Sequence, residues 1–318
     1  MTKILVVGGG RISLSHIPHL IASGAEVSVV EPGFVNRVIC KHFFGIEVRK
    51  KLKNYNISIF DLALVLTPPD SHFDICKELV RANVNCFVEK PLSTSASDSL
   101  ELLRLAREAN VSLFSGYVYR YHPMILKLKD IVKEIGPLDE FEVSFQMLSN
   151  VVNKDTSSSW RTKDGMGVLG DLGSHLFDLA LYIFNCSDLE LISASGCQIF
   201  SSNALDKFSA IFSDGKTSYK FEANWSCESA RKASLIIELK SPSCTIKTDM
   251  QSISIQNNGS EREINISECF TDVEYYLRGE EFQSQLQFVL ETLNKNEGFI
   301  DINAAVVDDM VSKVRGFV

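Results

Sequence analysis

The sequence predicts an α/β protein in two parts. We expect a doubly wound, mostly parallel α/β domain over residues 1–120, followed by an α+β domain with a large open, mainly antiparallel sheet over residues 121–318. Continuous apolar runs alternate with helical patterns in the first part, which is typical of parallel strands covered on both faces. A glycine-rich turn follows the first run. In the second part, strand patterns follow one another across short turns, which indicates an antiparallel sheet.

The elements of the first part follow from these patterns. Strands are expected at 3–7, 26–31, 62–67, 85–89 and 111–117, with a further short strand near 45–49, and helices at 11–23, 71–82 and 95–109. In the second part, helices are expected at 122–135, 170–184, 280–295 and 303–315, and strands at 139–148, 190–200, 207–212, 217–226, 233–240, 244–248 and 252–256.

Composition excludes several classes of partner. The 318 residues carry a net charge of −8, which argues against nucleic acid and against an anionic membrane surface. No apolar run approaches the roughly 20 residues of a membrane span. The eight cysteines are scattered without a C-x-x-C pair. We therefore expect reduced, mostly buried thiols in a cytoplasmic protein.

The stretch "VVGGGRISLSH" (6–16) follows the first strand and opens the first helix. A Gly-x-Gly-x-x-Gly turn lets a dinucleotide pyrophosphate approach backbone N–H groups at a helix N-terminus. Gly8 and Gly10 occupy its first two positions, with Arg11 and Ile12 beside them, and we expect these four to contact a cofactor. Ser13 replaces the third glycine. A purely structural glycine turn is the alternative.

Glu31 ends the second strand, about twenty residues after the turn, where an acid hydrogen-bonds the ribose 2′-OH of NAD. The same carboxylate would repel a 2′-phosphate. Pro32 stands where an arginine would have indicated NADP, but Arg37 lies nearby. NAD is the predicted cofactor and NADP the alternative.

Two further segments leave strands at the carboxyl edge of the predicted sheet, where ligands bind in open α/β folds. Thr67, Pro68 and His72 in "LTPPDSH" are expected to contact the cofactor, with a plain rigid loop as the alternative. Glu89 and Lys90 in "VEKP" are expected there too. A partly desolvated lysine beside a nicotinamide can donate a proton or hydrogen bond to a reacting oxygen. The alternative is a surface lysine.

The helix expected at 170–184 places polar residues on one narrow stripe and apolar residues around the rest. A helix apolar over most of its circumference is buried, so we expect the stripe to face a cavity. His175 suits a general base, Asp171 would orient it, and Asp178 would hold the ring or bind substrate. A satisfied core histidine is the alternative. No metal is expected, because no other His or Cys stands at ligand spacing.

Taken in order, "GGGRISLSH", "TPPDSHFD", "VEKPLS", "YVYRYHP" and "GVLGDLGSHLFDLALYIF" resemble the Gfo/Idh/MocA oxidoreductases. The resemblance implies an N-terminal Rossmann domain and a C-terminal domain whose sheet commonly forms the oligomer interface, hence a homodimer or homotetramer. It places the lysine of an E-K-P motif on Lys90, with the following peptide bond often cis. It places a D-x-G-x-H-x-x-D motif on Asp171, His175 and Asp178, which would line the pocket beside the nicotinamide with the histidine as acid or base.

The expected function is NAD(P)-dependent hydride transfer to or from a secondary alcohol or ketone of a sugar, cyclitol or nucleotide-linked sugar. Two alternatives stay open: a cofactor-binding regulator without catalysis, and a glycosidase that uses NAD transiently. Further substrate contacts are expected from two segments, although packing roles would explain them equally. These residues are Tyr119, Arg120, His122, Trp160 and Arg161.

Overall fold

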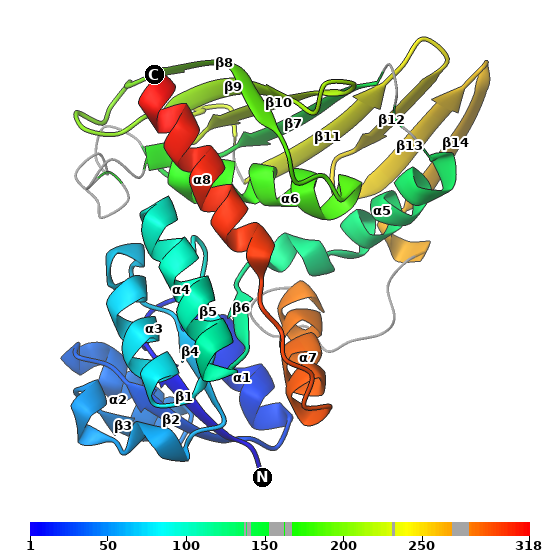
Figure 1. The fold of residues 1–318 in the computed structure, drawn as a ribbon. Helices are drawn as coiled ribbons and strands as arrows, with labels where there is room; N and C mark the ends of the chain where they lie inside the picture. The colour runs from blue at the N-terminus through cyan, green and yellow to red at the C-terminus, as the bar shows by residue number, and fades with distance from the viewer. Residues whose placement is uncertain (137, 139–140, 153–161, 163–166, 231–232, 269–279) are drawn as a thin grey trace. The chain divides into compact units, whose positions relative to one another are not determined.

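A computed structural model describes residues 1–136, 138, 141–152, 162, 167–230, 233–268 and 280–318 of the chain. Contacts divide the chain into two compact units. Unit 1 comprises Met1–Tyr121 and Val273–Asp308, and unit 2 comprises His122–Asp272 and Asp309–Val318. Each unit contains one sheet (Figure 1).

Unit 1 is built on a six-stranded sheet in the order β3-β2-β1-β4-β5-β6, with every neighbouring pair parallel. This is the doubly wound order in which the strand sequence reverses between β1 and β4, and it confirms the predicted fold. The central strands are almost completely buried, as their continuous apolar runs require. The elements are β1 (Lys3–Val7), α1 (Ser13–Ala22), β2 (Glu26–Val30), α2 (Phe34–Phe43), β3 (Glu47–Arg49), β4 (Leu62–Val65), α3 (His72–Arg81), β5 (Asn85–Val88), α4 (Ala96–Ala109) and β6 (Leu113–Ser115).

A segment from the far end of the chain completes unit 1. Helix α7 (Glu280–Asn294) packs on α1 and on the 3₁₀ turn η4 (Val118–Tyr121). Its Leu286 and Val289 belong to the same buried core as side chains of the parallel sheet. Residues 299–301 then run along β6, where the N–H of Leu113 donates to the carbonyl of Phe299 at 2.7 Å. The compact unit is therefore discontinuous in sequence.

Unit 2 contains an eight-stranded sheet in the order β14-β13-β12-β11-β7-β10-β9-β8. Only the β7–β10 pair is parallel, so the sheet is mainly antiparallel, as predicted. Its elements are α5 (Pro123–Ile135), β7 (Glu142–Leu148), α6 (Ser174–Phe184), β8 (Glu190–Cys197), β9 (Lys207–Ser213), β10 (Ser218–Asn224), β11 (Ser234–Lys240), β12 (Cys244–Thr248), β13 (Ser252–Asn257) and β14 (Ser260–Asn265). Helix α8 (Ile302–Phe317) begins in unit 1 and ends in unit 2.

Helices α5 and α6 cover one face of this sheet (Figure 1). Strands β7, β9 and β10 alternate buried and half-buried residues, which is the period of a sheet with one covered face. Aromatic rings fill the covered side: Phe177 of α6 lies 4.9 Å from Phe221 and 5.5 Å from Phe212, between ring centroids. This packing buries α6 on most sides, as its composition predicts.

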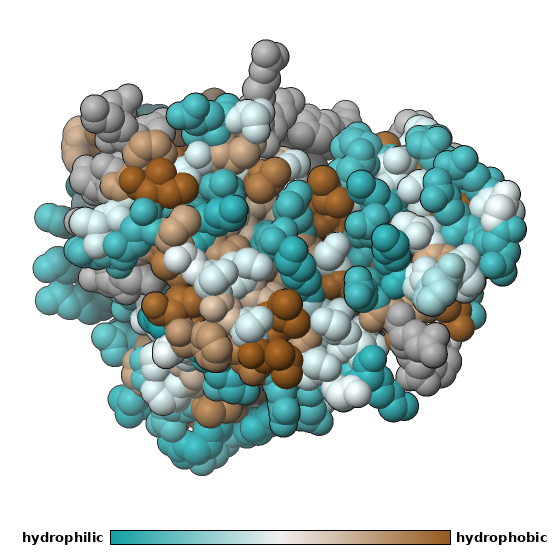
Figure 2. All heavy atoms as spheres, turned by 90° about the horizontal axis from the view of Figure 1, so that it is seen from above, coloured by the Kyte–Doolittle hydropathy of each residue, from teal (hydrophilic) through white to brown (hydrophobic). Residues whose placement is uncertain are grey.

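The other face of the sheet carries half-buried side chains of mixed polarity. Leu148, Ile211 and Ile236 lie there among serines, Gln146 and Glu238. Figure 2 shows hydrophobic areas interspersed with hydrophilic ones on the face of the molecule that it draws. No described helix of the unit covers this face (Figure 1).

Helix α2 and strand β14 are not among the elements predicted from the sequence. Helix α2 exposes its apolar side chains, with Phe34 72% and Phe43 77% exposed, so its pattern does not indicate a buried face. Strand β14 is an edge strand of sequence SEREIN with little apolar alternation. In the described part of the chain, no helix has the length and apolar character to cross a bilayer. Of the seven cysteines described, all free thiols, only three are buried, fewer than predicted.

Candidate active site

The glycine turn between β1 and α1 has the backbone that a dinucleotide site requires. Gly8 has a φ of +106°, and a Cβ there would lie 2.8 Å from the carbonyl oxygen of Leu66, the residue after the neighbouring strand β4. Only glycine fits such a position. Helix α1 begins at Ser13, whose hydroxyl donates to the carbonyl of Gly10 at 2.7 Å. Serine therefore takes the third glycine position without breaking the turn.

Glu31 folds back onto this turn from the end of β2. One carboxylate oxygen accepts the N–H of Gly9 at 2.7 Å, and the other accepts the N–H of Gly33. A carboxylate has about four lone-pair sites, so capacity remains for a ribose hydroxyl. Arg37 donates to the backbone carbonyls of Glu31 and Pro32, and this side chain is therefore already engaged within the loop.

The space above the turn is open to a ligand. A Cβ on Gly10 would meet no atom within 4 Å. Arg11 is exposed, whereas the side chain of Ile12 packs partly against the core of unit 1. The turn, the helix N-terminus and the acid at the end of β2 thus fit a dinucleotide, with Ile12 contributing backbone rather than side chain.

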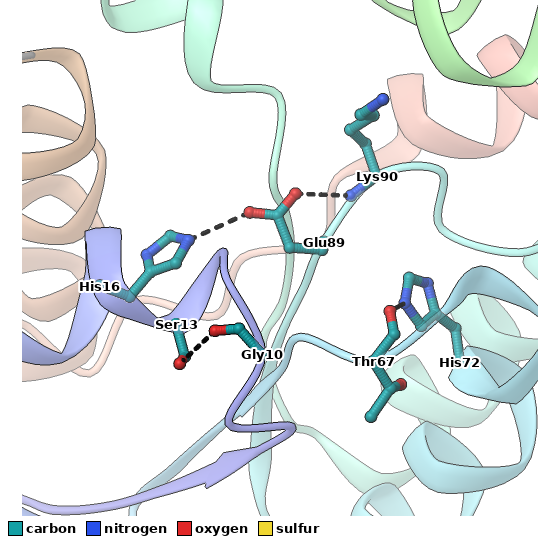
Figure 3. Close-up of polar contacts among 7 residues, drawn as sticks. All are labelled: Gly10, Ser13, His16, Thr67, His72, Glu89 and Lys90. Carbon is teal, nitrogen blue, oxygen red and sulfur yellow. Dashed lines mark hydrogen bonds and ion pairs between the residues drawn. The ribbon is translucent and has the colours of Figure 1, made fainter. Parts of the chain in front are cut away.

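Lys90 is the second residue after β5, at the carboxyl edge of the parallel sheet. The Lys90–Pro91 peptide bond is cis, which confirms the prediction. The backbone N–H of Lys90 lies 3.3 Å from Oε2 of Glu89, while its side chain extends away from that carboxylate (Figure 3). The ammonium group and the carboxylate therefore point in different directions from adjacent residues.

His72, which is predicted to contact the cofactor, contacts two backbone carbonyls. It is completely buried, and its ring nitrogens lie 2.8 Å from the carbonyl of Thr67 and 2.9 Å from that of Pro91. Burial lowers the pKa of His72. The ring ties the end of β4 to the segment after Lys90, so it positions this edge. Pro68 is exposed, and Thr67 is half-buried and accepts the hydroxyl of Ser71 at 2.7 Å.

Arg120, which is predicted to contact substrate, forms a buried ion pair. The residue is 8% exposed, and its guanidinium pairs with Asp301 through two contacts of 2.8 and 3.3 Å. Asp301 also accepts the hydroxyl of Ser115. A bidentate buried pair is a packing element of unit 1. Neighbouring Tyr119 is half-buried and its substrate role stays a prediction.

His122 caps helix α5. Its Nδ1 accepts the backbone N–H of Met124 at 3.2 Å, which requires an unprotonated nitrogen. Burial lowers the pKa of His122 to about 4, in agreement with that role. The cap accounts for the histidine without a substrate. Trp160 and Arg161 lie outside the described residues.

The predicted acid–base stripe belongs to unit 2. Asp171 lies in a π-helical turn, Leu169–Gly173, that leads directly into α6. The 100° spacing assumed from the sequence therefore applies only from Ser174 onward. Asp171 and His175 are half-buried, and Asp178 is 1% exposed. π-helical turns often occur at functional sites.

In unit 1, the sequence patterns did not identify His16 on α1 as a polar residue near Glu89. Its Nε2 lies 3.0 Å from Oε1 of Glu89 (Figure 3). The sequence feature that could have identified His16 is its position on the buried face of α1, three residues after Ser13. Across the described ranges, no group of three or more His, Cys, Asp or Glu residues is arranged to hold a metal ion.

Comparisons with known proteins match both units. Residues 2–117 match a family model described as "Oxidoreductase family, NAD-binding Rossmann fold", and residues 125–246 match the "GFO/IDH/MocA C-terminal domain". Scyllo-inositol 2-dehydrogenase (NADP(+)) of Bacillus subtilis is 30% identical over 41% of this chain and 36% of its own length. Glucose-6-phosphate 3-dehydrogenase of the same organism is 26% identical over 58% of this chain and 54% of its own length. The chain thus spans between about a third and a half of these relatives.

Solved structures share the fold over nearly the whole chain. A levoglucosan dehydrogenase in complex with NADH and levoglucosan gives a TM-score of 0.83 at 14% identity, covering 99% of this chain and 97% of that one. A UDP-N-acetylglucosamine 3-dehydrogenase from Acidithiobacillus ferrooxidans gives 0.79 at 16% identity, covering 100% and 97%. At these identities the likeness concerns the fold alone.

Proposed function

The chain belongs to the Gfo/Idh/MocA family of NAD-binding oxidoreductases, and on this premise we propose that it oxidises or reduces a secondary alcohol or ketone of a sugar, cyclitol or nucleotide-linked sugar. The observation that carries the proposal is the position of Lys90. It follows β5 at the carboxyl edge of the sheet, the edge on which the glycine turn opens. An ammonium group there can reach a substrate oxygen beside the cofactor.

The residues of the proposed site would have separate roles in the reaction. Bound NAD supplies the acceptor or donor of the hydride. Lys90 would donate a hydrogen bond to the substrate oxygen and stabilise the charge that develops on it. His175 would remove the hydroxyl proton during oxidation and return it during reduction, with Asp171 orienting the imidazole. Asp178 would bind a substrate hydroxyl or hold the ring.

NAD is the cofactor we propose, with NADP as the weaker ligand. The carboxylate of Glu31 at the end of β2 supports this preference, since it can accept a ribose hydroxyl and would repel a 2′-phosphate. Arg37, the nearby cation, is engaged with two backbone carbonyls. The glycine turn, with Gly8, Gly10 and the backbone of Arg11 and Ile12, would receive the pyrophosphate.

We also propose that the two parts of the chain have different functions. Residues 1–120 would bind cofactor, and residues 121–318 would bind substrate and form a homodimer or homotetramer through the uncovered sheet face. The half-buried Leu148, Ile211 and Ile236 on that face support an interface. Free thiols among the described cysteines support a reducing compartment, the cytoplasm.

The test is NADH formation or consumption over a panel of cyclitols, free sugars and nucleotide-linked sugars, each with NAD(H) and NADP(H). Lys90→Met should abolish turnover and leave NADH binding nearly intact. Lys133→Met, on an exposed lysine of α5, is the matched control and should keep wild-type activity.

Several results would count against the proposal. Unchanged turnover in Lys90→Met would remove the proposed role of this lysine. Cofactor binding without turnover of any panel member would favour the regulator, and substrate cleavage without net NADH would favour the glycosidase. A preference for NADPH would overturn the role given to Glu31.

A further inference from the structure

A buried histidine–glutamate pair links the glycine turn to the residue before Lys90. His16 lies on the inner side of α1, one turn after Ser13, and its side chain is completely buried. Its Nε2 lies 3.0 Å from Oε1 of Glu89 at the end of β5. Figure 3 shows the ring reaching from α1 toward that carboxylate. The proposed function gives His16 no role.

The surroundings of His16 fix which nitrogen carries hydrogen. The ring packs edge-on against Phe87 and Phe282, with both centroid distances at 5.4 Å. Nδ1 is buried and has no hydrogen-bond partner among the described residues. A hydrogen on Nδ1 would therefore be unsatisfied, at a cost. Since a carboxylate only accepts, Nε2 of His16 carries the hydrogen of this bond and donates it to Glu89.

Glu89 is held on its other sides as well. Its Oε2 lies 3.3 Å from the backbone N–H of Lys90. A Cβ on Gly116 would come within 2.9 Å of the Cα, Cδ and Oε2 of Glu89, so the carboxylate lies directly against that glycine. The side chain nevertheless keeps 14% of its surface exposed. It is a fixed negative charge with one open side.

The sheet order places this charge on one half of the cofactor crevice. The acid Glu31 follows β2, and the pyrophosphate turn follows β1. A dinucleotide bound with its adenosine over β2 would extend its other half across the switch point toward β4 and β5. Glu89 directly follows β5, on the side that the nicotinamide half would occupy.

We propose that His16 is a positioning residue that holds the Glu89 carboxylate as a fixed counter-charge for the oxidised nicotinamide. This inference rests on the proposed NAD-dependent function. Oxidised nicotinamide is cationic and reduced nicotinamide is neutral. A fixed anion therefore tightens binding of NAD⁺ relative to NADH and lowers the reduction potential of the bound cofactor.

The test compares the dissociation constants of NAD⁺ and NADH by calorimetric titration of the intact protein. Glu89→Gln keeps the shape and removes the charge, and should weaken NAD⁺ binding about tenfold more than NADH binding, the effect of one charge in a partly desolvated site. His16→Phe should shift the ratio in the same direction but less. His16→Gln retains an N–H donor and should restore a ratio near that of the wild type.

A purely structural pair would give a different result. If Glu89→Gln or His16→Phe weakens both forms of the cofactor equally, the inference is wrong. It is equally wrong if His16→Gln behaves like His16→Phe. The experiment distinguishes the proposed function from the proposed role of the pair. If the wild type binds neither NAD⁺ nor NADH, the proposed function is wrong. If the wild type binds both and the variants leave the ratio of the two dissociation constants unchanged, only the role of the pair is wrong. If His16→Phe does not fold, His16→Leu replaces it as the variant without an N–H donor, and Glu89→Gln still tests the counter-charge.

Discussion

Replacing Asp206 with asparagine should destabilise unit 2 more than any surface change, because this buried carboxylate accepts five hydrogen bonds. Oδ2 accepts the backbone N–H groups of Ile199, Phe200 and Ser201 at 2.6, 2.7 and 2.9 Å. Oδ1 accepts the hydroxyl of Ser201 at 2.6 Å and Nε1–H of Trp225 at 2.8 Å. All five of these groups donate a hydrogen bond, so each needs an acceptor atom on the side chain at position 206.

The magnitude follows from what an amide can replace. With its oxygen toward the three backbone N–H groups, the asparagine must point its NH₂ at Ser201 and Trp225. The serine hydroxyl can rotate and accept, but the buried indole N–H loses its acceptor and faces another donor. Adding that loss, about 1–3 kcal/mol, to the weakening of the charge-assisted bonds gives a decrease of about 4 kcal/mol in the free energy of unfolding.

The assay is urea unfolding of wild type and Asp206→Asn near neutral pH, followed by near-ultraviolet circular dichroism. Asp188→Asn, on an exposed aspartate, is the matched control and should change stability by less than about 0.5 kcal/mol. Trp225→Phe removes the conflicting indole donor. In that background Asp206→Asn should therefore cost about 1–2 kcal/mol less than in the wild type.

The stability difference between wild type and Asp206→Asn should depend on pH with a defined sign. Burial acts to raise the pKa of Asp206, but the bonds from Ser201 and Trp225 outweigh it and hold the pKa below its usual value. The wild-type advantage over Asp206→Asn should therefore be complete above about pH 4, the usual aspartate value, and disappear at lower pH. A loss below about 1 kcal/mol at neutral pH, or no coupling to Trp225, would refute the reasoning.

Three further results are expected. Burial raises the pKa of Asp308 to about 7, so the folded state keeps a proton that the unfolded chain releases; relative to Asp308→Asn, wild type should lose about 1.4 kcal/mol per pH unit between about pH 4 and pH 7 in urea unfolding, and parallel pH profiles would contradict this. Arg120→Met leaves Asp301 buried without its guanidinium partner and should lower the free energy of unfolding by about 3–5 kcal/mol; an equally stable variant with a raised KM would restore the substrate role. Ile236→Lys on the uncovered sheet face should reduce the mass measured by light scattering, and an unchanged oligomer would place the interface elsewhere.

Local patterns carried most of the fold. The apolar runs of β1, β4 and β5 identify buried parallel strands, because only strands covered on both faces lack alternation. The turn at Gly8 and Gly10, the acid Glu31 and the buried character of α6 follow from short-range rules of the same kind. Helix α2 was not predicted because its apolar side chains are exposed. Strand β14 was not predicted because an edge strand needs little apolar alternation.

The tertiary structure alone decided how polar groups distant in sequence pair with one another. Arg120 and His72 have the residue types of a binding site, yet Asp301 engages the first, and the carbonyls of Thr67 and Pro91 engage the second. The bond between His16 and Glu89 spans 73 residues. Periodicity within the sequence reports which side of an element is buried. It holds no information on which buried donor meets which acceptor, because that depends on the register of strands and helices packed together from separate parts of the chain.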